Sequence, residues 1–204
     1  TVDKKFGIVQ IIENINTGAL GGKGNTPVSL SFKAKVSGGG KLDNVKAAVI
    51  AWSGTADSVT SDVVSAWNAE GTAPTLATNW TYENTAANLS VTTSFADYKI
   101  ENISVDTSST NNVAVFIWSD VTDTDAGDFL YITDVQLEPG ATANDFKRET
   151  HTTTLSQCQR YYHKGQYAFI STSATTVVFN INFPTTMRTS PTISHEYAEG
   201  GTAN

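Results

Sequence analysis

The sequence predicts an all-β protein: a jelly-roll β-sandwich followed by a short helix and a small C-terminal β-rich part. Two observations support this. Short runs rich in Val, Ile and Phe recur along roughly the first 140 residues, and Gly, Asn, Asp and Ser separate them. A helical pattern is weak in the same stretch. About eight strands joined by turns are typical of a sandwich or jelly roll.

The clearest predicted strand is VSLSFKAKV, residues 28–36, in which apolar and polar side chains alternate. This period of two predicts a half-buried strand of an antiparallel sheet. Residues 45–52 and 113–118 are apolar on both faces, so we expect them to be central strands of a two-layer structure. They end in Trp52 and Trp118, which we expect to be neighbours in the sheet.

Further strands are expected along the rest of the chain. In the first part they are residues 6–13, 79–82, 89–93, 96–105 and 129–137. In the last part they are residues 166–171, 176–183 and 191–197. The segment TSDVVSAW, residues 60–67, fits either a short helix or an irregular loop, because Val63, Val64 and Trp67 are spaced i, i+1, i+4.

Composition narrows the range of partners. The net charge is −7 and the pI is about 4.8, and the 13 Lys and Arg residues are scattered, so nucleic acid is not an expected partner. The single cysteine excludes an intrachain disulfide and a multi-cysteine zinc site. No apolar run approaches the roughly 20 residues that span a bilayer, so no membrane insertion is expected. Strand-like runs close to both ends suggest a piece of a longer protein.

The sequence carries no enzyme signature. The motifs G-x-S-x-G and H-E-x-x-H and a phosphate-binding glycine loop are absent, and the three histidines lack metal-ligand spacing. A carboxylate pair for glycoside hydrolysis needs no local motif, but nothing points to one. We therefore expect a protein that is not an enzyme.

Trp67, Trp80 and Tyr82 are candidate glycan-binding residues. They lie in the irregular middle of the first part, and exposed aromatic rings on a β-sandwich are the usual platforms for sugar rings. Burial in the core is the competing interpretation for each residue taken singly.

Four aspartates are candidate metal ligands. Asp123, Asp125 and Asp128 surround Gly127 in a D-x-D pattern suited to a hard cation such as Ca²⁺, although the spacing lacks the final Glu of an EF-hand. An acidic hairpin tip that serves solubility is the alternative. Asp134 lies inside an apolar strand, where a carboxylate needs either a partner or a metal. A structural Ca²⁺ is the one cofactor we consider.

The segment LSQCQRYYHKG, residues 155–165, differs in composition from the rest. Thr154 and Gln157 form a T-x-x-Q capping box, and Gly165 suits a helix C-terminus. A helix of two to three turns, or a shorter one passing into a strand at Tyr161, fits this pattern. A nucleophilic cysteine is one interpretation, but packing is favoured. We assign the segment's core to a structural joint and subunit contact: Cys158, Gln159, Arg160, Tyr161 and Tyr162.

Several stretches together resemble bacteriophage tail-fibre and related virion structural proteins. They are FLYITDVQLEPG, DFKRE, LSQCQRYYHKG, FPTTMRTSPTI and, upstream, KAAVIAWSGTADSVTSDVVSAWNAEGT. The resemblance implies a jelly-roll domain like that of carbohydrate-binding modules over residues 1–147. It implies a helix linker with the CQRYY motif and a small β-rich part over residues 148–204, which is too short to bury a good core alone.

The resemblance also implies a function. It points to a non-enzymatic part of the virion tail, a homotrimer, that takes part in adsorption to the host surface through glycans. One alternative is a monomeric, extracellular carbohydrate-binding module of a secreted bacterial glycoside hydrolase or adhesin. Another is a tail depolymerase with carboxylates at a subunit seam.

Overall fold

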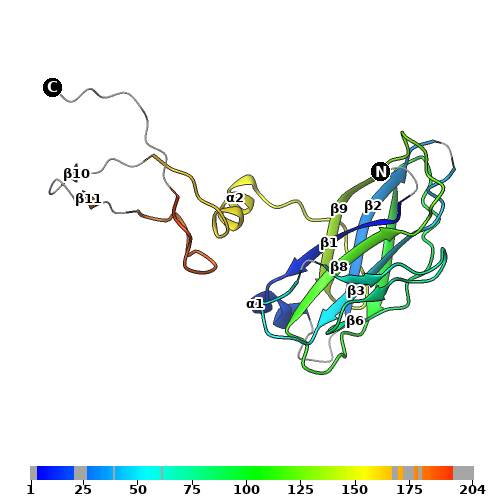
Figure 1. The fold of residues 1–204 in the computed structure, drawn as a ribbon, viewed down its shortest axis with the longest axis horizontal. Helices are drawn as coiled ribbons and strands as arrows, with labels where there is room; N and C mark the ends of the chain where they lie inside the picture. Colours follow the sequence, from blue (N-terminus) through cyan, green and yellow to red (C-terminus); the bar gives the residue numbers. More distant parts are fainter. Residues whose placement is uncertain are drawn as a thin grey trace. The chain divides into compact units, whose positions relative to one another are not determined.

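The computed structural model describes most of the chain (Figure 1). The described residues are 4–20, 27–38, 40–60, 62–166, 170–171, 177–178 and 181–194. The chain divides into two compact units, Thr1–Phe146 and Lys147–Asn204. A two-sheet β-sandwich makes up the first unit, which confirms the predicted all-β fold class.

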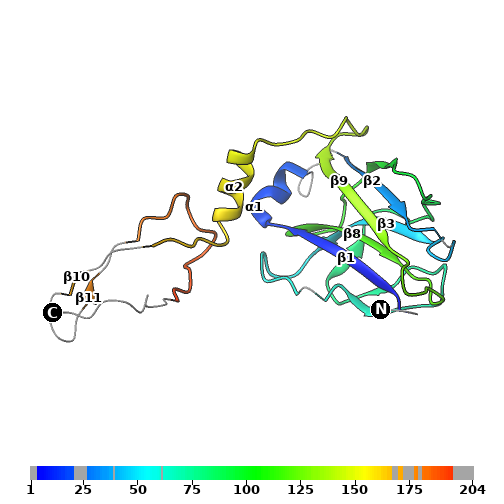
Figure 2. The ribbon, with the colours of Figure 1, turned by 90° about the horizontal axis from the view of Figure 1, so that it is seen from above.

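Two antiparallel sheets form the sandwich, and the view from above shows them as two layers (Figure 2). Sheet A has the strand order β1 (Phe6–Ile12), β8 (Asn112–Ser119), β3 (Val45–Trp52) and β6 (Trp80–Tyr82). Sheet B has the order β7 (Ala96–Ile103), β2 (Val28–Val36) and β9 (Leu130–Pro139). Successive strands alternate between the sheets for most of the unit, which is a jelly-roll type of connectivity.

The main core lies between the two sheets. Strand β2 contributes Val28, Leu30 and Phe32, and sheet A contributes Val49 of β3 and Val115 of β8. The apolar side of the alternating β2 sequence therefore faces sheet A, as its period of two predicts. Strands β3 and β8 are buried along their whole length, in agreement with the prediction that they are central.

A second apolar cluster covers the outer face of sheet A and explains why β3 and β8 are apolar on both sides. It contains Ile50, Trp80 and Trp118, and the segment at residues 59–77 packs over it. Part of that segment is a short hairpin of β4 (Val64–Ala66) and β5 (Thr75–Leu76). The expectation of a helix or irregular loop at residues 60–67 was therefore wrong in part, because cross-strand pairing made Val64–Ala66 a strand.

Two other local expectations were also wrong. Trp52 pairs with Asn112 and Trp118 pairs with Lys46, so the antiparallel register places the two tryptophans at opposite ends of the β3–β8 pair. Residues 89–93 form no strand, although the Leu89 amide donates to the Val45 carbonyl at 2.9 Å.

Short helices complete the described structure. Helix α1 (Asn14–Thr17) and the 3₁₀ turn η1 (Gly18–Leu20) follow β1. In the second unit, α2 (His151–Gln159) precedes a pair of two-residue strands, β10 (Ile170–Ser171) and β11 (Val177–Val178). Residues 166, 181–183 and 191–194 carry no strand, and the other residues of the strands expected there, apart from β10 and β11, lie outside the described residues. No helix in the described part of the chain is long and apolar enough to cross a membrane.

Candidate functional site

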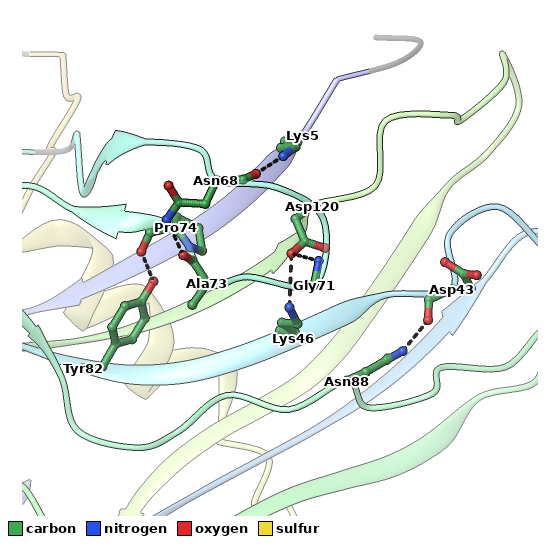
Figure 3. A network of polar contacts seen from close by, with 10 residues as sticks. All are labelled: Lys5, Asp43, Lys46, Asn68, Gly71, Ala73, Pro74, Tyr82, Asn88 and Asp120. Carbon is green, nitrogen blue, oxygen red and sulfur yellow. Dashed lines mark hydrogen bonds and ion pairs between the residues drawn. The ribbon is translucent and has the colours of Figure 1, made fainter.

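The outer face of sheet A is closed, and a polar network holds its cover in place (Figure 3). The ammonium of Lys46 and the carboxylate of Asp120 are both buried and lie 3.1 Å apart. The same Asp120 oxygen accepts the Gly71 amide at 3.1 Å, and the Tyr82 hydroxyl donates to the Pro74 carbonyl at 2.9 Å. These bonds fix the segment at residues 68–76 against the sheet.

Tyr82 is the titratable group that this cover perturbs most clearly. Its ring centroid lies 6.1 Å from that of Trp118, inside the second apolar cluster. Burial disfavours the charged phenolate and raises the pKa of Tyr82 to about 12. Tyr82 is therefore a neutral hydrogen-bond donor of the cover at physiological pH.

The three aromatic residues predicted to bind glycan do not form one open platform. Trp80 is only 6% exposed and packs against Trp52, with ring centroids 5.3 Å apart, so it belongs to the core. Tyr82 is half-buried under the cover. Trp67 is 37% exposed, just after β4. The core interpretation thus holds for Trp80, and the expectation of sugar stacking there is corrected.

The outer face of sheet B is different, because one half of it is open. The strand register shows which side chains lie next to one another across this face of sheet B. Lys35 of β2 lies opposite Tyr131 of β9, and Lys33 lies between Asp97 of β7 and Thr133 of β9. These side chains point away from the core, since the alternate residues of β2 face sheet A.

Two exposed aromatic rings flank Lys35, and a third lies beside one of them. The Lys35 ammonium lies 5.0 Å from the centroid of the Phe95 ring and 4.9 Å from that of Tyr131. The Phe129 and Tyr131 centroids are 6.2 Å apart. The exposed fractions are 50% for Phe95, 57% for Phe129 and 44% for Tyr131. We call these four residues the Lys35 platform, and it is the candidate functional site.

The other half of this face is covered by the segment that follows β9, residues 140–146. The Ala143 amide donates to Glu101 at 2.8 Å, and the Ala143 carbonyl accepts from Lys99 at 3.0 Å. The Ser29 hydroxyl of β2 donates to the Gly140 carbonyl at 2.8 Å. A ligand that lies along sheet B therefore has access only at the end that holds the Lys35 platform.

Asp134 borders the open half of the sheet. As expected for a carboxylate inside an apolar strand, it has a partner. Its carboxylate lies 3.5 Å from the Lys33 ammonium. Its φ of 53° is in the left-handed region, and the β2–β9 register shifts between Ser31 and Lys33. A β-bulge of this kind turns the Asp134 side chain toward the neighbouring strand.

The structure does not bring the four aspartates together as metal ligands. Asp125 pairs with Lys41 at 2.7 Å, and the Asp125 amide donates to Asp128 at 2.7 Å. The hydrogen bond that the Lys41 ammonium donates to the Asp125 carboxylate raises the pKa of Lys41. Among the residues described, no three His, Cys, Asp or Glu side chains form a group that could hold a metal ion. Binding of Ca²⁺ stays a prediction, which titration of the protein with Ca²⁺ would test.

The joint segment forms a helix, but not with the predicted start. Thr150, not Thr154, is the N-cap, and its hydroxyl accepts the Thr153 amide at 3.3 Å. Thr154 instead lies inside the first turn of α2. The helix ends at Gln159, well before Gly165. The threonine run offered several caps, and the sequence alone did not distinguish them.

The five joint residues lie at the end of α2 and just after it. Cys158, Tyr161 and Tyr162 are exposed, so the packing expected for Cys158 does not occur within this chain. The Arg160 carbonyl accepts the Arg188 amide at 3.0 Å. The CQRYY segment and the MRTSP segment of the sequence thus meet through their backbones in the second unit.

Sequence reasoning missed the Lys35 platform. One signal was present, because Tyr131 falls on the polar side of the alternating strand FLYIT, where a large ring is unusual. Phe95 gave no such signal. It stands just before β7, and only the pairing of β7 with β2 places its ring beside Lys35.

Comparison with known proteins gives little further guidance. No protein-family model and no curated protein matches the sequence. One solved structure that aligns is that of TmCBM61 in complex with β-1,4-galactotriose, with 15% identity and a TM-score of 0.32. The alignment covers 68% of this chain and 66% of that chain. It assigns no family. At this TM-score it carries no argument about function, so the proposals below rest on the residues of this chain.

Proposed function

We propose that this chain is a non-enzymatic, glycan-binding module of a bacteriophage tail fibre or related virion structure. The observation that supports binding most directly is the Lys35 platform. Three rings that are each about half exposed stand on the open half of a sheet whose other half is covered. Clustered exposed apolar side chains on a soluble domain mark binding sites more often than chance.

The chemistry of the platform suits a sugar ring. A pyranose presents C–H groups on one face, which pack against an aromatic ring, and hydroxyls at its edges, which need hydrogen-bond partners. Tyr131 provides the ring, and the next row of the sheet provides Thr133 and Asp97 as polar partners. Shallow sites of this kind bind through a few well-placed groups and not through a deep pocket.

The assignment to a virion rests on the sequence resemblance and extends to a homotrimer. Helix α2 supports an assembly, because it has nine residues and buries none of them in the single chain. A helix this short is marginal in water without packing. Leu155, Tyr161 and Tyr162 are exposed on and beside it and are the side chains that a subunit contact would cover.

Two measurements test these proposals separately. A glycan array tests binding: the wild-type chain should give signals that the Phe95→Ala/Tyr131→Ala double variant loses, while Trp67→Ala should retain them. Silence of the wild-type chain on every glycan rejects the binding function. Multi-angle light scattering tests the assembly. A trimer supports the fibre assignment, whereas a monomer that binds glycan favours a module of a secreted hydrolase or adhesin.

A further inference from the structure

The ammonium of Lys35 differs from those of the other lysines on the outer face of sheet B. Lys33 is 3.5 Å from the Asp134 carboxylate, and Lys99 donates to the Ala143 carbonyl at 3.0 Å. In the part of the chain that the structure describes, Lys35 contacts neither a carboxylate nor a carbonyl. Its neighbours are the rings of Phe95 and Tyr131.

Aromatic rings hold a cation in place without neutralising its charge. The attraction comes from the ring quadrupole, and the ammonium keeps its full positive charge and its hydrogen-bond donors. Lys33 lies on the same strand but already faces an anion. Lys35 is therefore a positive charge held in position at the centre of the platform, in a chain whose net charge is −7.

We infer that the Lys35 platform binds an anionic sugar residue. The inference rests on the proposed glycan-binding function, because it assigns a class of ligand to the same site. The C–H face of the pyranose packs on Tyr131, and the acidic group of the sugar reaches the ammonium of Lys35. Lysine is a compact point charge that does not require the forked geometry of arginine, so a carboxylate or a sulfate meets the same chemistry.

Polysaccharides whose only difference is their charge test this inference. Polygalacturonate, alginate and hyaluronate are immobilised beside their carboxyl-reduced, neutral forms, with heparan sulfate as a sulfated arm and neutral galactan as a reference. The wild-type chain should bind the acidic forms about two- to five-fold more tightly than the neutral forms, as expected for one exposed ion pair. Added salt should weaken this preference by screening.

Variants of single lysines assign the preference to Lys35. Lys35→Met should bring the ratio of acidic to neutral binding to about one, and Lys35→Arg should keep the preference. Lys4→Met is the matched control, because it removes the same charge from an exposed position before β1. Its ratio should equal that of the wild type.

The possible results distinguish the inference from the function on which it rests. Equal binding of acidic and neutral forms by the wild-type chain overturns the inference and leaves glycan binding intact. A preference that survives in Lys35→Met also overturns it. Absence of binding to every polysaccharide rejects the proposed function itself. Binding to heparan sulfate that is weakened both by desulfation of the polysaccharide and by Lys35→Met identifies sulfate as the source of the anion and supports the inference.

Discussion

Lys46 and Asp120 form an ion pair inside the protein, with 3.1 Å between the lysine Nζ and the carboxylate Oδ2. The pair joins β3 to the residue after β8, and Asp120 also accepts the Gly71 amide of the cover. It is therefore one of the points at which the cover of sheet A is fixed. Because that cover closes the outer face of sheet A, sheet B is the face that offers a binding surface.

Removing one partner of this pair should destabilise the protein strongly. Asp120→Ala leaves the Lys46 ammonium buried without its anion, and the expected loss in the free energy of unfolding is about 3–5 kcal/mol. The double variant Lys46→Met/Asp120→Leu removes both charges and should lose much less. Urea unfolding followed by tryptophan fluorescence measures both. Equal stability of Asp120→Ala and the wild type would show that the pair does not hold the cover.

Deprotonation of the Tyr82 hydroxyl should destabilise the protein at alkaline pH. Its pKa is about 12 in the folded protein, above the ordinary tyrosine value of 10.0, because burial disfavours the phenolate. The unfolded chain therefore releases the proton first, so this contribution is complete below pH 10 and is lost between pH 10 and about 12. The thermal midpoint of the wild type should fall faster in that window than that of Tyr82→Phe. Parallel curves for the two proteins would contradict the assignment.

Gly7 should tolerate no side chain. A Cβ built there lies 2.6 Å from a ring carbon of Phe116 and 3.1 Å from the Cβ of Trp118. Those two rings are themselves stacked with centroids 4.6 Å apart, so they have little freedom to move. Gly7→Ala should lower the free energy of unfolding by about 1–3 kcal/mol. Gly18→Ala is the control, because no atom of the described residues, apart from its neighbours along the chain, lies within 4 Å of its added Cβ. A similar loss at both positions would refute the packing argument.

The periodic parts of the sequence predicted the strands well. Alternation over residues 28–36 placed the polar and apolar sides of β2, and the doubly apolar runs identified β3 and β8 as central strands. Such patterns depend only on the geometry of one strand and on which of its faces is buried, so they can be read from the sequence of that strand alone.

The site was not predictable in the same way, because it depends on register between distant strands. Phe95, Lys35 and Tyr131 come from three separate strand regions, and only their pairing brings them together. Trp80 was predicted to be part of a glycan platform, but it is buried against Trp52. This burial depends on the segment that covers sheet A, which the sequence did not reveal. Tyr161 and Tyr162 are exposed in the second unit, and the subunit contact proposed for them stays a prediction.

Binding of a glycan at the Lys35 platform is the central claim, and titration calorimetry tests it most directly. The glycan with the strongest array signal is titrated into the wild-type chain, Tyr131→Ala and Trp67→Ala. Loss of one stacking ring should weaken binding by about five- to ten-fold in Tyr131→Ala, following the typical contribution of an aromatic contact. Trp67→Ala should bind like the wild type. Unchanged affinity in Tyr131→Ala, with binding lost in Trp67→Ala, would place the site elsewhere and contradict the account.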